Sequence, residues 1–319
     1  MVDVFPFTDL SDEEFALVNS NFDTNFNSWM DLENCDLNLK TFQYTDHDSF
    51  DYENDIDIDY NCFNTVNIKC SYFTENHFKN KNKAKGDLSI IHFNCRSLSA
   101  NFAHLQSYLN LDLDYIFDVI TLSETWFNTS SNIDLYHIPG YDMCHIDRSD
   151  KRGGGVALYI HNSIKYSKVD KLCIAINDAL ECISVELKFE NRRNIIVSCL
   201  YRQQGSSIDT LTDTIEQCFR YKRSDVYLCG DLNINLLNYQ NQGSTRDFLD
   251  ALFSLGLFPL IDRPTRITRH TASLIDNIFS NVLHSDLECG ILINDVSDHL
   301  AVFSISKSNI SRKKLNEYI

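Results

Sequence analysis

Short apolar runs recur along the chain from Leu88 onward, and they constrain the fold more than any other feature of the sequence. Each run has the length and the enrichment in β-branched and aromatic residues that are typical of a strand. We predict eight strands, at residues 88–93, 119–123, 156–160, 182–187, 194–201, 226–229, 274–279 and 301–305. Stretches between them have the apolar spacing of helices, namely Phe102, Leu105 and Leu109, then Leu211, Ile215 and Phe219, and residues 246–255.

The helical stretches are too few to lie between every pair of strands. Successive strands of a fully parallel sheet need a crossover connection, which is usually a helix. We therefore predict an α+β (α/β) fold, a four-layer α/β sandwich in which two packed mixed β-sheets are flanked by helices. This domain is expected to occupy residues 87–307, followed by a short basic C-terminal tail at 308–319.

The first 86 residues differ from the rest in charge and pattern. They hold 17 acidic and 6 basic residues, a net charge of −11, so −6 of the chain's formal −17 belongs to the remainder. Asp and Asn alternate loosely with aromatic residues, and no strand or helix period persists. We expect residues 1–86 to be an acidic, largely disordered N-terminal segment. It is either a solvated tail or a docking segment for an unknown protein partner.

We expect neither a secretory signal nor a transit peptide from the first residues of the sequence. The chain does not begin with a basic segment followed by an apolar one, and no run approaches the ~20 apolar residues of a membrane span. Its 11 cysteines include no Cys-x-x-Cys pair, which favours reduced thiols over a disulfide framework or a zinc site. We expect a nuclear or cytoplasmic protein that is not secreted and has no membrane partner.

Two short motifs at strand ends carry groups suited to phosphoester chemistry. Gly230-Asp231-Leu232-Asn233 follows one apolar run, and Ser297-Asp298-His299 precedes another. Other predicted strands end at, or lead into, Asn94, Glu124, Tyr201, Arg202 and Asp276. If these strand ends meet at one rim, they supply oxygen ligands for a hard divalent cation, donors for phosphate oxygens and a proton acceptor.

Taken singly, each of these residues also has a structural interpretation. Asn94 and Asn233 could cap turns, and Glu124 could stand near the start of a helix. Tyr201 could simply pack in the core, and Asp276 could pair with a surface Arg. Only the set as a whole favours catalysis. Residues 153–155, three consecutive glycines, predict a tight turn, because no Lys-Ser/Thr follows as a nucleotide-binding loop requires.

Residues 88–306 resemble the endonuclease/exonuclease/phosphatase superfamily, and within it the apurinic-type endonuclease domain of non-LTR (LINE-type) retrotransposons. The similarity rests on nine motifs in family order: His92-Phe93-Asn94-Cys95-Arg96-Ser97-Leu98, Leu122-Ser123-Glu124-Thr125-Trp126, Pro139-Gly140-Tyr141, Arg152-Gly153-Gly154-Gly155-Val156, Tyr201-Arg202, Gly230-Asp231-Leu232-Asn233, Pro264-Thr265, Leu274-Ile275-Asp276 and Ser297-Asp298-His299. The chain departs from the family at Gln203-Gln204, where prolines are common, and at Leu232, where Phe is more usual.

The resemblance implies a metal site and a water-activating pair. Glu124 would hold Mg²⁺, with Mn²⁺ as a possible substitute, and Asn94 beside it would contact the metal or the phosphate. Asp298 would serve a second metal position or support the first. Asp231 would activate the attacking water, and Asn233 would orient that water or hold the scissile phosphate.

The resemblance also implies which residues meet the phosphate. Tyr201 and His299 would hydrogen-bond the oxygens on which negative charge grows, and Asp276 would orient the imidazole of His299. A cationic His299 could donate to both phosphate and carboxylate. The remaining substrate-binding residues would be Arg202, Thr265 and Ser297.

The expected function is Mg²⁺-dependent DNA nicking, which in LINE-type elements frees a 3′-hydroxyl to prime reverse transcription. A phosphatase of the same superfamily acting on phosphoinositides or nucleotides is one alternative, and a domesticated or decayed DNA-binding copy is another. The reverse transcriptase domain is absent from this chain, so we expect a solo domain, a truncated copy or a fragment. For DNA binding, a basic rim is expected from Lys151-Arg152, Arg192-Arg193, Lys222-Arg223 and the group Arg263, Arg266, Arg269 and His270.

Overall fold

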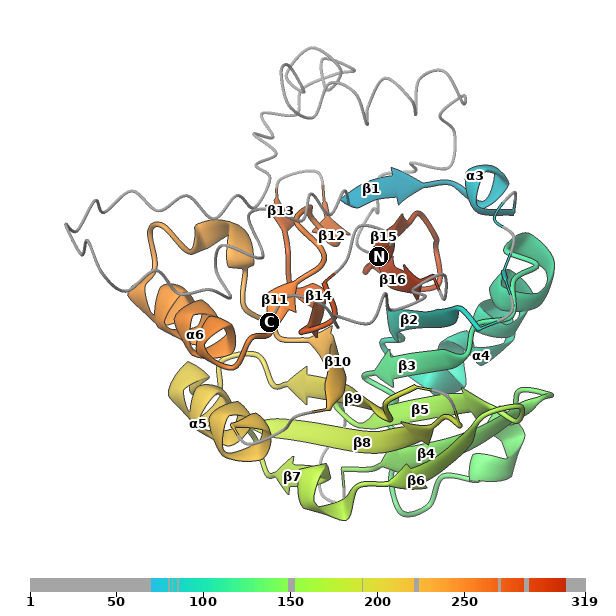
Figure 1. Ribbon diagram of the computed structural model, residues 1–319, viewed down its shortest axis with the longest axis horizontal. Coiled ribbons are helices and arrows are strands. Elements are labelled where there is room, and N and C mark those ends of the chain that lie inside the picture. Colours follow the sequence, from blue (N-terminus) through green and yellow to red (C-terminus); the bar gives the residue numbers. More distant parts are fainter. Residues whose placement is uncertain are drawn as a thin grey trace, which may run out of the picture.

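Two seven-stranded mixed sheets pack face to face, and helices lie on their outer sides (Figure 1). The computed structural model describes residues 70–307, except 80, 82, 85, 149–152, 191, 221–223, 269–270 and 284–286. This arrangement confirms the predicted α/β sandwich with two mixed sheets. The expected C-terminal tail, 308–319, lies outside the described residues.

The first sheet contains both parallel and antiparallel neighbours. Its order is β1 (Cys70–Phe73), β15 (Leu287–Leu292), β16 (Ala301–Ser306), β2 (Leu88–Asn94), β3 (Val119–Ser123), β5 (Val156–His161) and β4 (Tyr141–Ile146). β2 runs parallel to β3 and antiparallel to β16. The outer helices are α3 (Glu75–Lys79), α4 (Leu98–Ser107), the π-helical turn η3 (Tyr108–Asp112) and η4 (Ile133–Tyr136).

The second sheet is built in the same mixed manner. Its order is β11 (Phe258–Pro259), β14 (Asp276–Ser280), β10 (Asp225–Asp231), β9 (Ile195–Arg202), β8 (Leu180–Lys188) and β6 (Lys165–Lys168), with β7 (Ile174–Ile176) also paired to β8. β9 runs parallel to β10, whereas β14 runs antiparallel to it. Short elements complete the fold: η5 (Asp170–Leu172), η6 (Leu236–Asn238), and the paired strands β12 (Arg266–Ile267) and β13 (Ala272–Ser273).

The continuous apolar character of the central strands follows from burial on both faces. Every residue of β2 is buried, and its side chains alternate between two cores. Leu88 and Ile90 belong to the core between the sheets, whereas Ile91 and Phe93 pack under the outer helices. Because neither face meets water, such a strand needs apolar residues throughout and shows no polar alternation.

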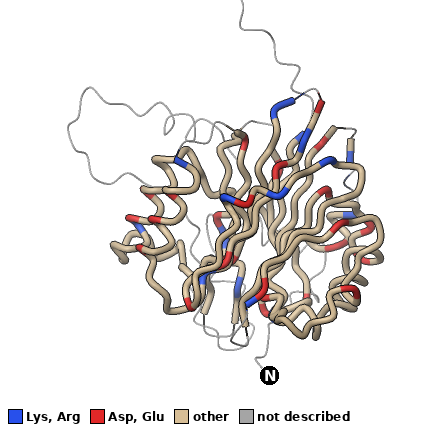
Figure 2. The backbone as a smooth tube through the Cα atoms, turned by 90° about the horizontal axis from the view of Figure 1, so that it is seen from below, with Lys and Arg blue, Asp and Glu red and all other residues tan. Residues whose placement is uncertain are grey.

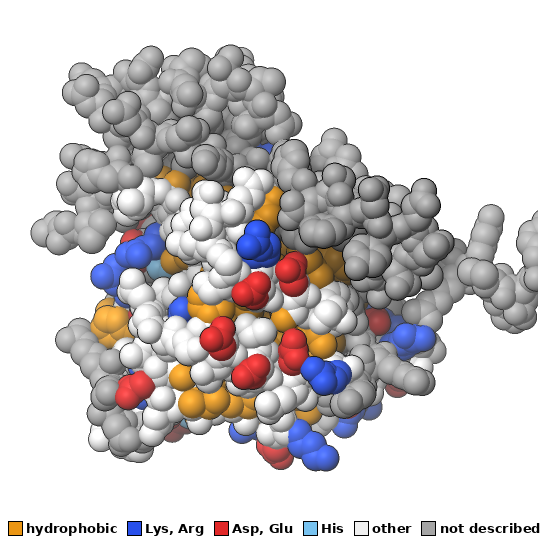
Figure 3. Space-filling model, turned by 90° about the vertical axis from the view of Figure 1, so that its left-hand side faces the viewer, with side chains coloured by type: hydrophobic (Ala, Val, Ile, Leu, Met, Phe, Trp, Pro, Cys, Tyr) orange, Lys and Arg blue, Asp and Glu red, His pale blue; other side chains and the backbone are white. Residues whose placement is uncertain are grey.

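Two amphipathic helices cover the second sheet. α5 (Ile208–Phe219) buries Leu211, Ile215 and Phe219, as the sequence spacing predicted, and Ser207 caps its first turn by accepting from the Thr210 amide. α6 (Gly243–Ser254) packs beside it. Acidic side chains gather at the middle of the outward face of this pair (Figure 3). Among the described residues, no helix is both long and apolar enough to cross a membrane.

The directions of the strands place the ends of six of them at one rim of the fold. The carboxyl ends of parallel β2 and β3 lie together, as do those of β9 and β10. β16 and β14 run antiparallel to these strands, so they bring their amino ends to the same edges. A hydrogen bond from Asn94 at the end of β2 to Asp231 at the end of β10 joins the two edges into one site.

The fold extends further toward the amino terminus than expected. Residues 70–79 were assigned to the acidic segment 1–86, but β1 pairs in parallel with β15, and α3 buries Phe78 against Tyr115, Phe117 and Phe303. A strand this short gives little periodicity in the sequence, and it is formed by pairing with a partner more than 200 residues away. Residues 1–69 lie outside the described residues.

Replacing Phe78 with Ala tests whether this early segment belongs to the core. The ring is fully buried, so we expect Phe78→Ala to lower the free energy of unfolding by about 3–5 kcal/mol. Urea unfolding followed by circular dichroism measures the change. Leu111→Ala is the control, because Leu111 is 70% exposed and its truncation should change stability by less than about 0.5 kcal/mol. Equal stabilities of the two variants would contradict the assignment.

Candidate active site

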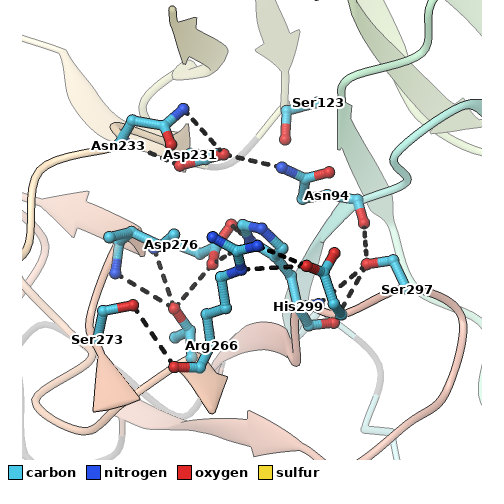
Figure 4. A network of polar contacts seen from close by, with 12 residues as sticks. Asn94, Ser123, Asp231, Asn233, Arg266, Ser273, Asp276, Ser297 and His299 are labelled. Carbon is cyan, nitrogen blue, oxygen red and sulfur yellow. Dashed lines mark hydrogen bonds and ion pairs between the residues drawn. The ribbon is translucent and has the colours of Figure 1, made fainter. Parts of the chain in front are cut away.

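Four strand ends, those of β2, β10, β14 and β16, bring polar side chains together at the rim between the two sheets. Asn94, Asp231, Asn233, Asp276, Ser297 and His299 lie close to one another there (Figure 4). Asn94, Asp231, Asp276 and His299 are each at least 94% buried. Buried polar groups need partners, and each of these four has at least one hydrogen bond within the group. The gathering that the sequence suggested is therefore present.

Asp231 stands fully buried at the end of β10, and its loop is tightly fixed. The Asn233 backbone amide donates to Asp231 Oδ1 at 2.8 Å, and the Asn233 side chain donates to the Arg202 carbonyl at 2.8 Å. Gly230 has to be glycine, because a Cβ there would overlap the backbone carbonyl of Leu200 on β9. This close approach holds the ends of β9 and β10 together.

Asn94 connects the carboxylates of the two sheets. Its Nδ2 donates to Glu124 Oε1 at 3.1 Å and to Asp231 Oδ2 at 2.8 Å. Its Oδ1 accepts from the Arg96 backbone amide at 3.0 Å. Ser297 supports the same strand end, since its hydroxyl donates to the Asn94 carbonyl at 2.6 Å and accepts from the His299 amide at 3.1 Å. Ser297 therefore ties β2 to the start of β16.

His299 and Asp276 form a buried dyad. His299 Nδ1 lies 2.9 Å from Asp276 Oδ2 and 3.1 Å from Oδ1. The Thr265 hydroxyl donates to Asp276 Oδ2 at 2.7 Å and accepts from the Asp276 backbone amide at 3.1 Å. Thr265 was expected to bind substrate, but its side chain is fully buried behind Asp276. The structure thus gives it a contact that positions the dyad.

Electrostatic coupling in this dyad favours an ion pair. Burial alone would lower the pKa of His299, but the charge of Asp276 and the hydrogen bond to it outweigh burial and raise that pKa to about 9. Burial likewise opposes ionisation of Asp276, yet the neighbouring imidazolium holds the pKa of Asp276 below its ordinary value. The expected cationic His299 is supported by this geometry.

Asp231 experiences the opposite environment. Burial first, and the negative charge of Asp276 second, raise the pKa of Asp231 to about 7 in the metal-free protein. The charge of His299 and the hydrogen bond from the Asn233 amide lower the pKa of Asp231, but by less than burial and Asp276 raise it. A carboxylate with such a pKa can accept a proton near neutral pH.

Asp298 is paired with arginines. Arg96 Nη1 lies 2.6 Å from Asp298 Oδ2, and Arg266 Nη2 lies 2.7 Å from the same oxygen. Burial would raise the pKa of Asp298, but His299 and the two arginines hold it below its ordinary value. Its Oδ1 is buried and has no hydrogen-bond partner among the described residues. The two guanidinium groups compete with a metal ion for this carboxylate, whereas Oδ1 remains a possible ligand atom.

Tyr201 and Arg202 lie at the end of β9, where they contact different groups. Tyr201 is buried, and its ring lies 5.9 Å from the guanidinium of Arg148. Burial, followed by the charges of Glu124 and Asp231, raises the pKa of Tyr201, so its hydroxyl stays a donor. Arg202 is also buried, and its Nη1 donates to the Gln203 carbonyl at 3.2 Å. Arg202 was expected to bind substrate. Its side chain is buried in this structure, so a contact with substrate would require it to become exposed.

The residues present fit a divalent cation. Asp231, Asp276 and His299 each offer a ligand atom, and these atoms lie within 4.8 Å of one another. A ligating imidazole has to be neutral, however, and the raised pKa of His299 opposes that form. Glu124 and Asp231, which meet at the Asn94 amide, are oxygen donors of the kind that Mg²⁺ and Mn²⁺ prefer.

Several contacts were missed by the sequence analysis. Arg266 was singled out only as part of a basic group, and Arg96 only as a letter in a motif, yet both contact Asp298. Trp126, at the end of another motif, donates from its indole to Glu124. Arg96, Glu124 and Trp126 share one structural feature, a positive φ, which is uncommon for non-glycine residues.

The expected basic rim is only partly present. Arg96 and Arg266 flank the site, whereas Arg263 is buried and donates to the Cys70 carbonyl. Arg192 and Arg193 precede β9, so they lie at the edge opposite to Tyr201. Lys151-Arg152, Lys222-Arg223, Arg269 and His270 lie outside the described residues. Basic and acidic residues are otherwise interspersed along the described backbone (Figure 2).

The family is decided by a direct match of the sequence. Residues 91–299 match the profile of the Endonuclease/Exonuclease/phosphatase family, which is well over half of the chain. The chain belongs to this family. Membership together with the buried acid and histidine cluster makes it a metal-dependent phosphoester hydrolase. No curated protein matches this family member at the level of sequence.

Solved structures share the fold of this family member. The AP endonuclease LMAP from Leishmania major is 13% identical with a TM-score of 0.56, and the match covers 73% of this chain and 98% of that one. An AP endonuclease from Archaeoglobus fulgidus is 17% identical with a TM-score of 0.50, covering 69% and 99%. A 3′ phosphatase from Neisseria bound to a product DNA hairpin is 15% identical with a TM-score of 0.50, covering 69% and 99%. At these identities the likeness establishes the fold alone.

The protonation of His299 can be measured in the metal-free protein. We expect its ring to be protonated at pH 7 and to titrate with a pKa of about 9, by NMR of the imidazole. Because this pKa is above the ordinary 6.5, the ion pair stabilises the fold fully below pH 6.5 and less as pH rises through 9. Asp276→Asn should lower the pKa of His299, because it removes the negative charge that opposes the effect of burial.

His92 provides an internal reference for that titration. Burial lowers its pKa to about 4, so its ring should remain neutral throughout. Asp213→Asn, on the exposed face of α5, is the control substitution and should leave His299 unchanged. A wild-type His299 pKa at or below 6.5 would contradict the ion pair.

Proposed function

We propose that this protein is a Mg²⁺-dependent DNA endonuclease that hydrolyses one phosphodiester and nicks the duplex. The observation that carries the proposal is the convergence at one rim of the Asp276–His299 dyad, the Asp231–Asn233 pair and the Asn94–Glu124 contact. Phosphodiester hydrolysis builds negative charge on phosphate oxygens, so its catalyst needs a base on one side and fixed donors on the other. These two kinds of group are held here by different strands.

Asp231 is the proposed base. Its pKa of about 7 allows it to take a proton from the attacking water at neutral pH. The Asn233 amide fixes one carboxylate oxygen, so the other is directed toward the shared space near Asn94. Asn233 itself would orient the water or hold the scissile phosphate.

His299 is the proposed donor to the phosphate. Its Nδ1 is engaged by Asp276, which leaves the other ring nitrogen to donate to a phosphate oxygen. The Tyr201 hydroxyl would add a second donor from β9, and its raised pKa keeps the proton in place. Ser297 would act mainly by holding the strand ends that carry Asn94 and His299.

A bound Mg²⁺ or Mn²⁺ supplies Lewis-acid stabilisation of the charge that develops during hydrolysis. We propose that Glu124 holds the cation with Asn94 beside it. Asp298 Oδ1 is the candidate for a second position or for support of the first. This assignment keeps His299 free to remain protonated.

Arg96 and Arg266 are the proposed contacts for the DNA backbone. Their side chains are 46% and 35% exposed, and both reach the rim through Asp298. Cationic groups beside an acidic site allow a polyanion to approach despite the negative net charge of the chain. The Neisseria 3′ phosphatase with its product DNA hairpin supports the choice of substrate by analogy.

We further propose a place for this activity in a LINE-type retrotransposon, where the nick frees a 3′-hydroxyl for priming. The support is the order of the motifs between residues 88 and 306. Such a role acts on chromosomal DNA, so the protein would work in the nucleus. Residues 1–69 are the region in which a protein partner would be sought.

Incubating the protein with supercoiled plasmid and Mg²⁺ tests the proposal. We expect relaxed circles from the wild type, and at least about 100-fold slower nicking by Asp231→Asn and by His299→Ala. Chelation with EDTA should abolish nicking, and added Mn²⁺ should restore it. Asp213→Asn matches the first substitution on an exposed helix face and should nick at the wild-type rate. Turnover of a phosphoinositide or nucleotide without nicking would instead indicate a phosphatase.

The backbone contacts have their own test. Arg96→Gln should raise the KM for plasmid and lower the slope of log affinity against log salt by about 1, because one phosphate contact is lost. Arg193→Gln is the matched control, since Arg193 is exposed and precedes β9 at the opposite edge. Equal effects of the two substitutions would place the DNA elsewhere.

A further inference from the structure

Both oxygens of the Glu124 carboxylate are held by donors. Asn94 Nδ2 donates to Oε1 at 3.1 Å, and the indole Nε1 of Trp126 donates to Oε2 at 3.0 Å. Glu124 and Trp126 are only two residues apart, so an extended chain would place their side chains on the same side but would not fold one back onto the other. Their backbone must bend for the indole to reach the carboxylate.

The bend is visible in the backbone angles. Glu124 has φ 54° and Trp126 has φ 58°, both in the left-handed region that L-residues rarely adopt. Such angles persist only where the surroundings over-determine them. Here the Trp126 amide donates to the Gly154 carbonyl at 2.9 Å, and the Thr125 amide donates to the Gly155 carbonyl at 3.3 Å. The three-glycine turn therefore holds the strained segment 124–126.

The positive φ angles of Gly154 (+68°) and Gly155 (+84°) favour glycine in that turn. A Cβ on Gly155 would also overlap the Thr125 hydroxyl, whereas a Cβ on Gly154 would displace the flexible guanidinium of Arg148. Gly153 approaches Trp126 itself, with its would-be Cβ at 3.9 Å from the indole nitrogen. The motif that the sequence predicted as a simple tight turn thus packs against the residues beside Glu124.

We propose that Trp126 is a positioning residue, held by the turn 153–155, that orients the Glu124 carboxylate to receive the divalent cation. A donor to one oxygen fixes the plane of a carboxylate and so the direction of its lone pairs, which is how residues behind a ligand tune metal affinity. The inference rests on the proposed role of Glu124 as a metal ligand. It does not depend on whether the substrate is DNA.

Mn²⁺ binding to the full chain, followed by the electron paramagnetic resonance signal of the free ion, tests the proposal. Trp126→Phe keeps an aromatic ring but removes the N–H, so we expect the Kd for Mn²⁺ to rise about tenfold or more. At saturating Mn²⁺, plasmid nicking by this variant should recover toward the wild-type rate. A role in packing alone would lower the melting temperature and leave the Kd unchanged.

A second variant reaches the same contact from the glycine turn. Gly155→Ala should also weaken Mn²⁺ binding, because the new methyl group displaces Thr125 between Glu124 and Trp126. Gly256→Ala is the control, since Gly256 has φ 69° but open space around its would-be Cβ. It incurs similar backbone strain far from the site and should leave the Kd unchanged.

Fluorescence gives an independent measurement. The chain has two tryptophans, so Trp29→Phe leaves Trp126 as the sole tryptophan, whose indole can be excited selectively over the tyrosines. Mn²⁺ should quench its emission saturably, with the Kd found by paramagnetic resonance. An unchanged Kd in Trp126→Phe, or no Mn²⁺ binding by the wild type, would overturn the inference. Weakened binding without any plasmid nicking would support the inference and reject the endonuclease proposal.

Discussion

The site depends on one hydrogen-bonded bridge between the two sheets. Asn94 ends a strand of the first sheet, and its amide reaches both Glu124, which directly follows β3 of that sheet, and Asp231 in the second sheet. Two carboxylates brought to a buried rim repel each other unless a donor or a cation lies between them. The amide supplies that donor in the protein alone, and the same arrangement of oxygens suits a divalent cation. The packing of the two sheets and the chemistry at their rim therefore both depend on the hydrogen bonds of Asn94.

Other buried carboxylates near this bridge are paired with cationic side chains. His299 balances Asp276, Arg96 and Arg266 balance Asp298, and Arg148 forms a close ion pair with Glu181 beside Tyr201. Among the described residues, the hydrogen-bond donors to the Asp231 carboxylate are the amides of Asn94 and Asn233, and its pKa rises to about 7. A buried carboxylate with a raised pKa is a candidate for proton transfer, which agrees with the proposed role of Asp231 as the base.

Prediction from the sequence succeeded where burial imposes its own pattern. Central strands such as β2 and β9 are buried on both faces, so their apolar runs are visible without knowledge of their neighbours. Short or half-exposed strands were missed, among them β1 and β6, because their residues become strands through pairing. The contacts of Thr265 and Trp126 were missed for a related reason: each depends on a backbone path that local sequence does not specify.

The sequence by itself determined the class of fold, the strand ends that carry polar groups and the membership of the family, because apolar runs and short motifs are local properties. The tertiary structure decided which groups touch. It joined Asn94 to Asp231 across the sheets, brought Arg266 to Asp298, and placed the glycine turn under Trp126. Such contacts link residues far apart in the chain, and their energies depend on burial and distance, which exist only after the sheets have packed.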